Sequence, residues 1–250
     1  MINNNLLKED ETIDDLQINN LYIIQKRNGY KFGTDPVLLT NFAHIRKFDF
    51  VVDFGTGTGI IPILMSAKYP LTKFAAFEIQ NEMAEMAQRS IILNNLEDII
   101  KIYNEDLVNA NKIIGNELAD FVVCNPPYGK INSTLLNKNQ NKRFSKHEYN
   151  IGLEDIIESA FKILRYGGKL AMCIPSARLL ELMNCFQKFN IEPKRLLLVQ
   201  SYIHKAPYLA LLEGVKGGRS GLHILKPLII YNEDRSMSDE AKIIYNKKTS

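Results

Sequence analysis

Four consecutive residues, Asn125-Pro126-Pro127-Tyr128, bring together the groups that could hold a planar amine for chemistry. The Asn125 side-chain oxygen and the Pro126 carbonyl can each accept one N–H of the amine, which draws its nitrogen toward tetrahedral geometry and frees the lone pair. Prolines fix φ, so this carbonyl is held in place before a substrate arrives. Tyr128 can stack on the planar group. Two prolines could simply end a strand, but that role does not explain the flanking asparagine and tyrosine.

A glycine-rich loop is the second chemical feature. The segment Asp53-Phe-Gly-Thr-Gly-Thr-Gly59 lies between a buried apolar stretch and a segment with helical periodicity. Glycines let the backbone turn sharply and approach a ligand closely. A dinucleotide-binding loop would need a third glycine three residues after its second, where this chain has Ile60. The spacing instead resembles the S-adenosylmethionine loop of class I methyltransferases.

Two acids follow at the ends of the next two expected strands. Glu78 comes 19 residues after Gly59, at a position where an acid can bind both hydroxyls of a ribose. Asp106 ends the third strand, where class I methyltransferases hold the adenine amino group. The resemblance implies S-adenosyl-L-methionine as cofactor and a set of residues that binds it: Asp53, Gly55, Thr56, Gly57, Gly59, Glu78, Asp106 and, beside the reacting group, Asn125.

The Asn-Pro-Pro-Tyr segment is similar to the catalytic (N/D)PP(Y/F/W) motif of enzymes that methylate a planar nitrogen. This likeness implies that Asn125, Pro126 and Tyr128 are catalytic and that the methyl group passes in line from sulfonium to nitrogen. No strong general base is expected, because the methylated product loses its proton readily. We therefore interpret His147 as a phosphate contact or loop cap, and Cys124 as a core residue.

The expected elements place these residues at one edge of a sheet. Strands and helices alternate from residue 50 onward, which predicts a doubly wound, mostly parallel α/β sheet with helices on both faces. In such sheets ligands sit beyond the carboxyl ends of the strands. The pattern fits the seven-stranded class I methyltransferase sheet (Rossmann-like), with strands expected at 50–54, 73–78, 99–103, 119–124, 169–174, 195–200 and 208–212.

Glycine and serine suggest two helix ends. Gly167 and Gly168 should close a helix over residues 153–165 in the left-handed conformation. Ser176 should cap a helix that runs to about Phe189.

Composition bounds the class of protein. The chain has 250 residues, 46% of them hydrophobic and 24% charged, as expected for one globular domain. Its longest apolar runs fall far short of the roughly 18 residues that a membrane span needs, and its polar, acidic start does not fit a signal peptide. Three cysteines without a CxxC pair argue against structural zinc or a disulfide framework. We expect a cytoplasmic protein without a metal or a membrane segment.

Charge is unevenly distributed along the chain. The formal net charge is +3, but the first fifteen residues hold one lysine against five acids. Residues 129–147 hold five cations and no acid. Such a basic stretch suits a polyanion, although many charge runs are only solvated faces.

Residues 28–35, 51–60 and 123–128 together resemble the bacterial tRNA1(Val) (adenine-37)-N6-methyltransferase family, and the likeness spans about residues 15–232. It implies methyl transfer to N6 of an adenine in the anticodon loop of a tRNA, a base that is already unpaired and cheap to extrude. In this family the region of Thr34 helps to close the cofactor site, which adds Thr34 to the cofactor set. The basic loop would contact RNA through Lys130, Lys142, Arg143, Phe144 and Lys146.

The same likeness divides the chain. We expect a flexible acidic arm over residues 1–20, a methyltransferase domain over 21–232 and a polar C-terminal tail over 233–250. Within the domain, residues 21–48 form a short N-terminal extension of strand, turn and helix. The sequence carries no signal of an oligomeric state.

Three alternatives remain at this point. The same motif serves enzymes that methylate the glutamine amide of peptide release factors, but these usually carry a helical domain before the methyltransferase core. DNA adenine methylation would call for a target-recognition domain, which the pattern does not suggest. A non-catalytic RNA-binding module is disfavoured because Asp53, Glu78, Asp106, the glycines and the Asn-Pro-Pro-Tyr segment are all present.

Overall fold

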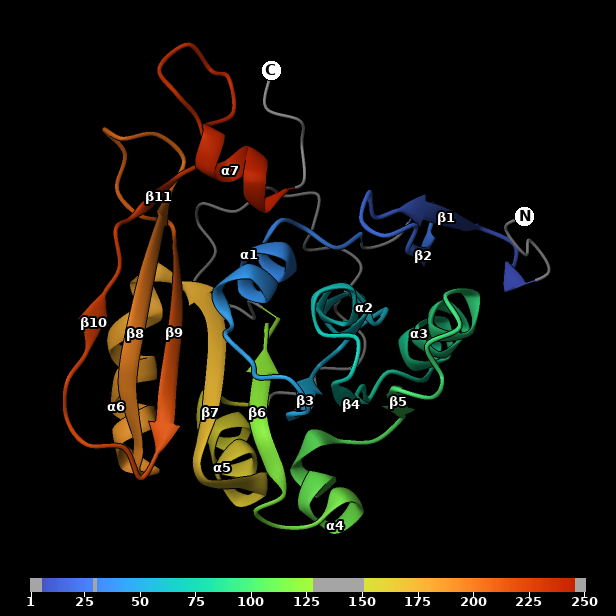
Figure 1. Ribbon diagram of the computed structural model, residues 1–250, viewed down its shortest axis with the longest axis horizontal. Helices are drawn as coiled ribbons and strands as arrows, with labels where there is room; N and C mark the ends of the chain where they lie inside the picture. The colour runs from blue at the N-terminus through green and yellow to red at the C-terminus, as the bar shows by residue number, and fades with distance from the viewer. Residues whose placement is uncertain (1–5, 29–30, 128–150, 246–250) are drawn as a thin grey trace.

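A computed structural model describes residues 6–28, 31–127 and 151–245. Within these ranges one nine-stranded sheet runs through the molecule (Figure 1). Its main strands lie in the order β5-β4-β3-β6-β7-β9-β8, and only β9 runs antiparallel to its neighbours. The strands are β3 (Phe50–Phe54), β4 (Lys73–Phe77), β5 (Ile100–Tyr103), β6 (Ala119–Cys124), β7 (Leu164–Pro175), β8 (Ile191–Gln200) and β9 (Leu209–Lys216), with two-residue strands β10 (His223–Ile224) and β11 (Leu228–Ile229) beside β8.

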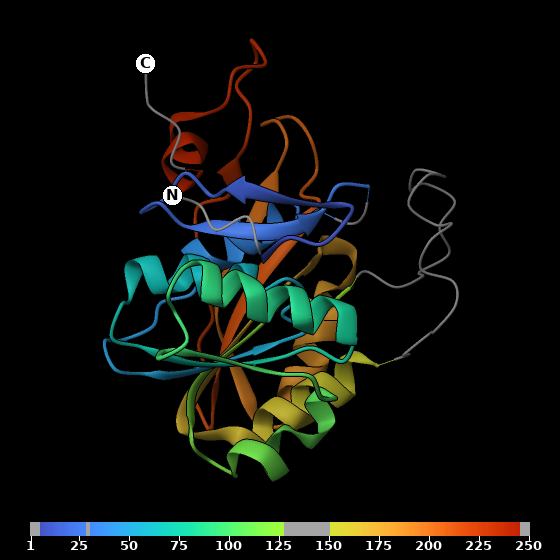
Figure 2. The ribbon, with the colours of Figure 1, turned by 90° about the vertical axis from the view of Figure 1, so that its right-hand side faces the viewer.

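Helices cover both faces of the sheet, because its central strands bury side chains on both sides. In β3, Val51 belongs to the core on one face and Val52 to the core on the other, and both are fully buried. Figure 2 shows α3 on one side of the sheet and α4 and α5 on the other. The helices are α1 (Asp35–Phe42), α2 (Ile60–Lys68) and α3 (Asn81–Leu93) on the first face, and α4 (Ala110–Ile114), α5 (Leu153–Ile163) and α6 (Leu179–Lys188) on the second. The expected doubly wound α/β fold is confirmed.

Two expected helix ends are wrong. The residue after α5, Leu164, has extended backbone (φ −67°, ψ 131°) because it begins β7 at once. Gly167 has a φ of 75° but lies inside β7, so it caps no helix. Ser176 opens a short 3-10 turn before α6, and its hydroxyl donates to the Pro207 carbonyl (2.6 Å) instead of capping the helix.

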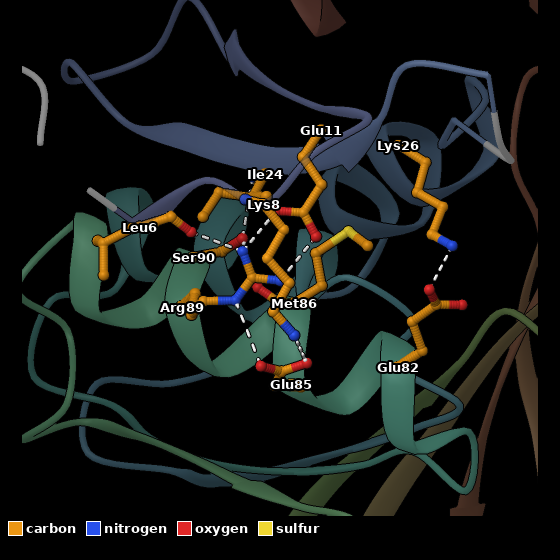
Figure 3. A network of polar contacts seen from close by, with 10 residues as sticks. All are labelled: Leu6, Lys8, Glu11, Ile24, Lys26, Glu82, Glu85, Met86, Arg89 and Ser90. Atoms are coloured by element: carbon orange, nitrogen blue, oxygen red, sulfur yellow. Dashed lines mark hydrogen bonds and ion pairs between the residues drawn. The ribbon is translucent and has the colours of Figure 1, made fainter. Parts of the chain in front are cut away.

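The expectation of a loose arm over residues 1–20 is wrong for Glu11–Asp15. These residues form β1, which pairs antiparallel with β2 (Tyr22–Lys26). The hairpin is attached to α3 by an ion pair (Figure 3): the Arg89 guanidinium donates to both carboxylate oxygens of Glu11, at 2.5 and 2.7 Å. This contact lowers the pKa of Glu11. The two side chains are only 13% and 5% exposed, so the pair lies largely out of water.

Side chains of Ser90 and of Asn94, the residue after α3, attach the backbone of β2 as well. The Ser90 hydroxyl accepts from the Ile24 N–H (3.0 Å), as Figure 3 shows. Asn94 accepts from the Tyr22 N–H (2.8 Å) and donates to the Tyr22 carbonyl (2.7 Å). On the edge of β2 that faces α3, the backbone N–H groups of Tyr22 and Ile24 and the Tyr22 carbonyl therefore have hydrogen-bond partners.

Part of the expected C-terminal tail is folded. A short helix, α7 (Asp239–Ile244), begins where the Ser238 hydroxyl accepts from the Ala241 N–H (3.1 Å). Ala241 is fully buried. The Asn41 side chain of α1 donates to the Ile244 carbonyl (3.3 Å), so α7 is attached to α1 near the other end of the sequence.

The described part of the chain holds neither a membrane-spanning helix nor a cluster of metal ligands. No helix there is long and apolar enough to cross a bilayer. Nor do three or more His, Cys, Asp or Glu side chains gather there in a way that could hold a metal ion.

Candidate active site

The glycine-rich loop leaves the sheet at the carboxyl end of β3. The backbone N–H groups of Gly55 and Thr56 both donate to the Phe77 carbonyl at the end of β4 (2.9 and 3.0 Å). Gly55, Gly57 and Gly59 have φ values of 72°, 59° and 86°, a region that L side chains rarely adopt. A Cβ added at Gly55 would meet no atom within 4 Å, so open space lies against the loop.

Asp53, two residues before the loop, is a buried carboxylate. It is 1% exposed, and neither of its oxygens has a hydrogen-bond partner of good geometry among the described residues. Burial raises the pKa of Asp53 to about 7, against the effect of the Thr56 hydroxyl and with a further contribution from the charge of Glu78. A buried carboxylate without donors is costly, and a ligand that brings N–H groups would satisfy it.

Glu78, the residue after β4, faces the loop. Its Oε2 accepts from the Gly57 N–H and its Oε1 from the Gln80 N–H, both at 2.9 Å. Burial raises the pKa of this carboxyl, and the backbone donors oppose that rise. A carboxylate oxygen can accept more than one hydrogen bond, so Glu78 keeps acceptor capacity for a pair of ligand hydroxyls while it holds the loop.

The end of β5 contributes Asp106 and a residue that the sequence did not single out. Asp106 caps a 3-10 turn, η2 (Leu107–Asn109), through a hydrogen bond from the Val108 N–H to its Oδ1 (3.1 Å). The missed residue is Asn104, whose Nδ2 donates to the carbonyls of Glu78 (2.9 Å) and Ile79 (3.2 Å). Asn104 thus joins the ends of β4 and β5. A polar side chain directly after a strand was the only signal for it.

Asn125 follows β6, the strand next to β3. Phe54 pairs with Cys124 across these two strands. Gly55 and Asn125 therefore leave the sheet from neighbouring strands, which lie about 4.8 Å apart. Asn125 is half-buried, Pro126 is buried and Pro127 is exposed. The remaining expected site residues lie outside the described part of the chain: Tyr128, Lys130, Lys142, Arg143, Phe144, Lys146 and His147.

Cys124 is a core residue, as expected. It is 1% exposed, and burial, followed by the nearby charges of Asp53 and Cys173, raises the pKa of its thiol well above the usual value. A thiol held neutral in this way is a poor nucleophile.

Thr34 lies at a different part of the same edge. It is exposed and begins α1, and its hydroxyl donates to Asp35 Oδ1 (3.2 Å). It lines a hollow of about 330 Å³ together with Ser201, Tyr208, Ile230, Tyr231, Met237 and Tyr245. The structure thus groups Thr34 with the segments that follow β8 and β11, and its contact with a cofactor stays a prediction.

The residues at the loop fit S-adenosylmethionine. The buried Asp53 carboxylate has no hydrogen bond of good geometry among the described residues, open space lies at Gly55, and Glu78 and Asp106 follow the next two strands. Strand order, antiparallel β9 and this loop together define a class I methyltransferase, the class of enzyme that takes its methyl group from S-adenosylmethionine.

Comparisons with known proteins agree with this class. A predicted O-methyltransferase from Agrobacterium tumefaciens superposes with a TM-score of 0.69 at 21% identity, over 85% of this chain and 95% of that one. The Pyrococcus horikoshii protein TYW2, solved in complex with MeSAdo, gives a TM-score of 0.56 at 17% identity, over 84% and 73% of the two chains. At such identities the likeness concerns the fold.

Sequence comparisons identify the family. The methyltransferase small domain family matches residues 26–190. The tRNA1(Val) (adenine(37)-N6)-methyltransferase of Porphyromonas gingivalis is 30% identical over 189 residues, which is 73% of each chain. The enzyme of that name from Tolumonas auensis is 25% identical over 192 residues, 76% of this chain and 78% of its own. The chain belongs to the methyltransferase small domain family and, within it, to the tRNA1(Val) (adenine(37)-N6)-methyltransferases, so the expected resemblance is confirmed.

Proposed function

We propose that this enzyme transfers a methyl group from S-adenosyl-L-methionine to N6 of an adenine in tRNA, at position 37 beside the anticodon. The names of its relatives support the substrate and the position. The observation that carries the proposal is the pairing of Phe54 with Cys124, because it brings Asn125 to the strand next to the glycine loop. A reaction between cofactor and amine needs the two sites to be neighbours.

The cofactor would be held by the glycine-rich loop and the acids around it: Asp53, Gly55, Thr56, Gly57, Gly59, Glu78 and Asp106. The Asp53 carboxylate would accept from its amino group, Glu78 from the two ribose hydroxyls, and Asp106 from the adenine amino group. Backbone amides of the glycine loop would approach it closely, since no Cβ intervenes. When bound, S-adenosylmethionine supplies an electrophilic methyl group, which the nitrogen lone pair takes in line as the carbon–sulfur bond breaks.

Asn125 and Pro126 would prepare the adenine amine. The Asn125 side-chain oxygen accepts one N–H and the Pro126 carbonyl the other, so the lone pair is no longer drawn into the ring. The ring of Tyr128 would stack on the base, as aromatic residues do in enzymes that act on an extruded base. The methylated nitrogen then gives its proton to water. The rate of methyl transfer would come from holding the amine in line with the methyl group and from hydrogen-bond acceptors that are fixed in place before the reaction.

The test is methyl transfer from labelled S-adenosylmethionine, offered in parallel to unmodified tRNA, duplex DNA and a peptide release factor. Nucleoside mass spectrometry then identifies the labelled product. N6-methyladenosine in tRNA is expected with the wild-type chain and none with Asn125→Ala, while calorimetry shows cofactor affinity nearly unchanged in the variant. Label in the release factor or in DNA instead would overturn the proposed substrate and leave the fold and cofactor in place.

A further inference from the structure

Two hollows share one aromatic wall at the carboxyl edge of the sheet. The first, the phenol hollow, is the space of about 330 Å³ that Thr34, Tyr208, Tyr231 and Tyr245 line. The second, the Tyr202 hollow, has about 430 Å³ and is lined by Tyr202, His204, Lys205, Glu233 and Arg235. Tyr231 lines the phenol hollow, and its ring packs against that of Tyr202, with centroids 5.6 Å apart. The Tyr202 ring in turn stacks on His204 at 5.7 Å and an interplanar angle of 21°.

The two loops that carry these rings are bonded to each other and to the sheet. The Ile230 and Tyr231 N–H groups donate to the carbonyls of Gln200 and Ser201 (both 2.9 Å). Beyond them, residues 231–237 close on themselves through a bridge between Tyr231 and Met237. Figure 1 shows both loops at the same end of the sheet as α7. These backbone hydrogen bonds hold the segments of Tyr202 and Tyr231 side by side and so fix the relative position of the two rings.

The phenol hollow is the nearer of the two to the proposed reaction centre. Its Tyr208 precedes β9, which begins two strands away from β6, about 10 Å along the edge of the sheet. Tyr202 follows β8, the third strand from β6, about 14 Å along the edge. Pro175 at the end of β7 pairs with Leu209, the residue after Tyr208. If a base is held at Asn125, the nucleotides that flank it in the RNA strand are long enough to extend along the edge to the two hollows.

The chemistry of the wall matches an unpaired strand better than a duplex. Lys205 and Arg235 offer cations, but Glu233 lies in the same hollow and limits the net positive charge. A duplex is held mainly through its phosphates, whereas an unpaired strand also stacks its bases on aromatic rings. His204, Tyr208 and Tyr231 are exposed and Tyr202 is half-buried. This aromatic wall beside a few cations therefore favours single-stranded nucleic acid.

The phenol hollow also holds a buried hydroxyl. The Tyr245 hydroxyl makes no hydrogen bond of good geometry among the described residues, although Thr34 lies near enough to oppose the rise in its pKa. Burial raises the pKa of Tyr245 to about 12, so the phenol stays neutral and can donate and accept. A hollow of this volume is at the lower end of small-ligand pockets, roughly 300–1,000 Å³. Its lining of phenols and one methionine suits a planar base with polar edges.

We propose that the two hollows bind unpaired RNA nucleotides that flank the target adenine, with one base in the phenol hollow and a neighbouring base stacked on the Tyr202 ring. This inference rests on the proposed function, since it deepens how that substrate is bound.

The test compares Tyr202→Ala, Tyr202→Phe and a matched control, Tyr166→Ala. Tyr166 is 74% exposed and lies near the start of β7, away from the carboxyl edge. The probe is a short RNA hairpin with an adenine in its unpaired loop, used free or annealed to a complementary strand. Removal of the Tyr202 ring should raise the Kd and KM for the free hairpin about tenfold, while kcat and cofactor affinity stay unchanged. Tyr202→Phe keeps the ring and should match the wild type, as should Tyr166→Ala.

Each contrary result has a distinct meaning. A wild-type enzyme that methylates the hairpin, with an unchanged KM in both Tyr202→Ala and His204→Ala, would overturn this inference and leave the proposed function standing. Equal weakening of free and annealed RNA would also overturn it, because stacking on unpaired bases would not be the cause. Absence of transfer to any RNA by the wild type, with transfer to a release factor, would overturn the proposed function and this inference together.

Discussion

The backbone N–H of Gly57 donates to Oε2 of Glu78 across 2.9 Å, so the acid proposed to bind the cofactor ribose also holds the loop that would enclose the cofactor. The shape of the loop and, under the proposed assignment, the binding of the cofactor would both depend on this one carboxylate. The other oxygen of Glu78 accepts from Gln80, which fixes the orientation of the side chain.

Glu78→Gln should weaken both functions of this residue. An amide offers only one acceptor oxygen, so either Gly57 or Gln80 loses its partner. We expect cofactor affinity to fall about tenfold or more and the free energy of unfolding to fall by about 1–3 kcal/mol, measured by calorimetry and urea unfolding. Glu82→Gln is the control, because the side chain of Glu82 is 66% exposed and pairs with Lys26 at the surface. Unchanged affinity in Glu78→Gln would contradict the assigned role.

Asp53 should make the stability of the ligand-free protein depend on pH. Its pKa is about 7 in the folded state and 3.8 without the fold. Between these values the folded chain holds a proton that the unfolded chain has lost, so the free energy of unfolding falls as pH rises from about 4 to about 7. The shift amounts to at most about 4 kcal/mol. Asp53→Asn should remove this slope in urea unfolding, and a slope that persists in the variant would assign it to another group.

Cofactor affinity should show the opposite trend. If Asp53 accepts from the cationic amino group of the cofactor as proposed, its ionised form should bind best, so affinity should rise about tenfold per pH unit below 7 and level off above it. Calorimetry of the wild type and of Asp53→Asn across this range measures the effect. Affinity that is flat with pH in the wild type would place the amino group elsewhere.

Gly59→Ala should strain the loop. The φ of 86° is left-handed, and an added Cβ would lie 3.4 Å from Ala87 Cβ on α3. The conformation alone costs about 1–2 kcal/mol. Gly33→Ala is the matched control, since a Cβ there meets no atom within 4 Å, and it should change stability by less than about 0.5 kcal/mol. Thermal unfolding of the two variants compares them, and equal stability would contradict the strain.

Glu11→Gln should release the N-terminal hairpin from α3. Loss of one partner of a largely buried pair costs about 3–5 kcal/mol, and here the effect should concentrate on β1 and β2. Hydrogen exchange of the Ile24 N–H, which donates to Ser90, should therefore speed up most. The exposed pair between Lys162 and Glu158 supplies the control: Glu158→Gln should cost no more than about 1 kcal/mol. Unchanged protection at Ile24 would show that the hairpin does not depend on Arg89.

The basic segment offers a prediction from sequence alone. Reversal of Lys142, Arg143 and Lys146 to Glu should weaken tRNA binding and flatten its dependence on salt, by about 0.7 in log–log slope for each lost contact with a single strand. Filter binding at several salt concentrations measures this slope. An unchanged slope would place the RNA elsewhere on the surface.

The central sheet and the glycine loop were predictable because their signals are local. A parallel strand buried on both faces leaves an unbroken apolar run, as at Phe50–Phe54, and positive φ values demand glycines at fixed spacing. β1 was not predictable, because its sequence is mostly polar and its anchor, Arg89, comes 78 residues later. The phenol hollow was missed for a similar reason: Thr34 and Tyr245 meet only when the chain is folded.

The hydrogen bond between Asn41 and the carbonyl of Ile244 spans 203 positions of the sequence. Contacts of such separation form late, because a long loop must close first. The parallel strands β3 to β7 lie closer together in the sequence and can pair before this contact forms. The wall proposed to receive RNA is then completed only once α7 has packed against α1, so recognition of the nucleotides beside the target would arise later in folding than the glycine-rich loop.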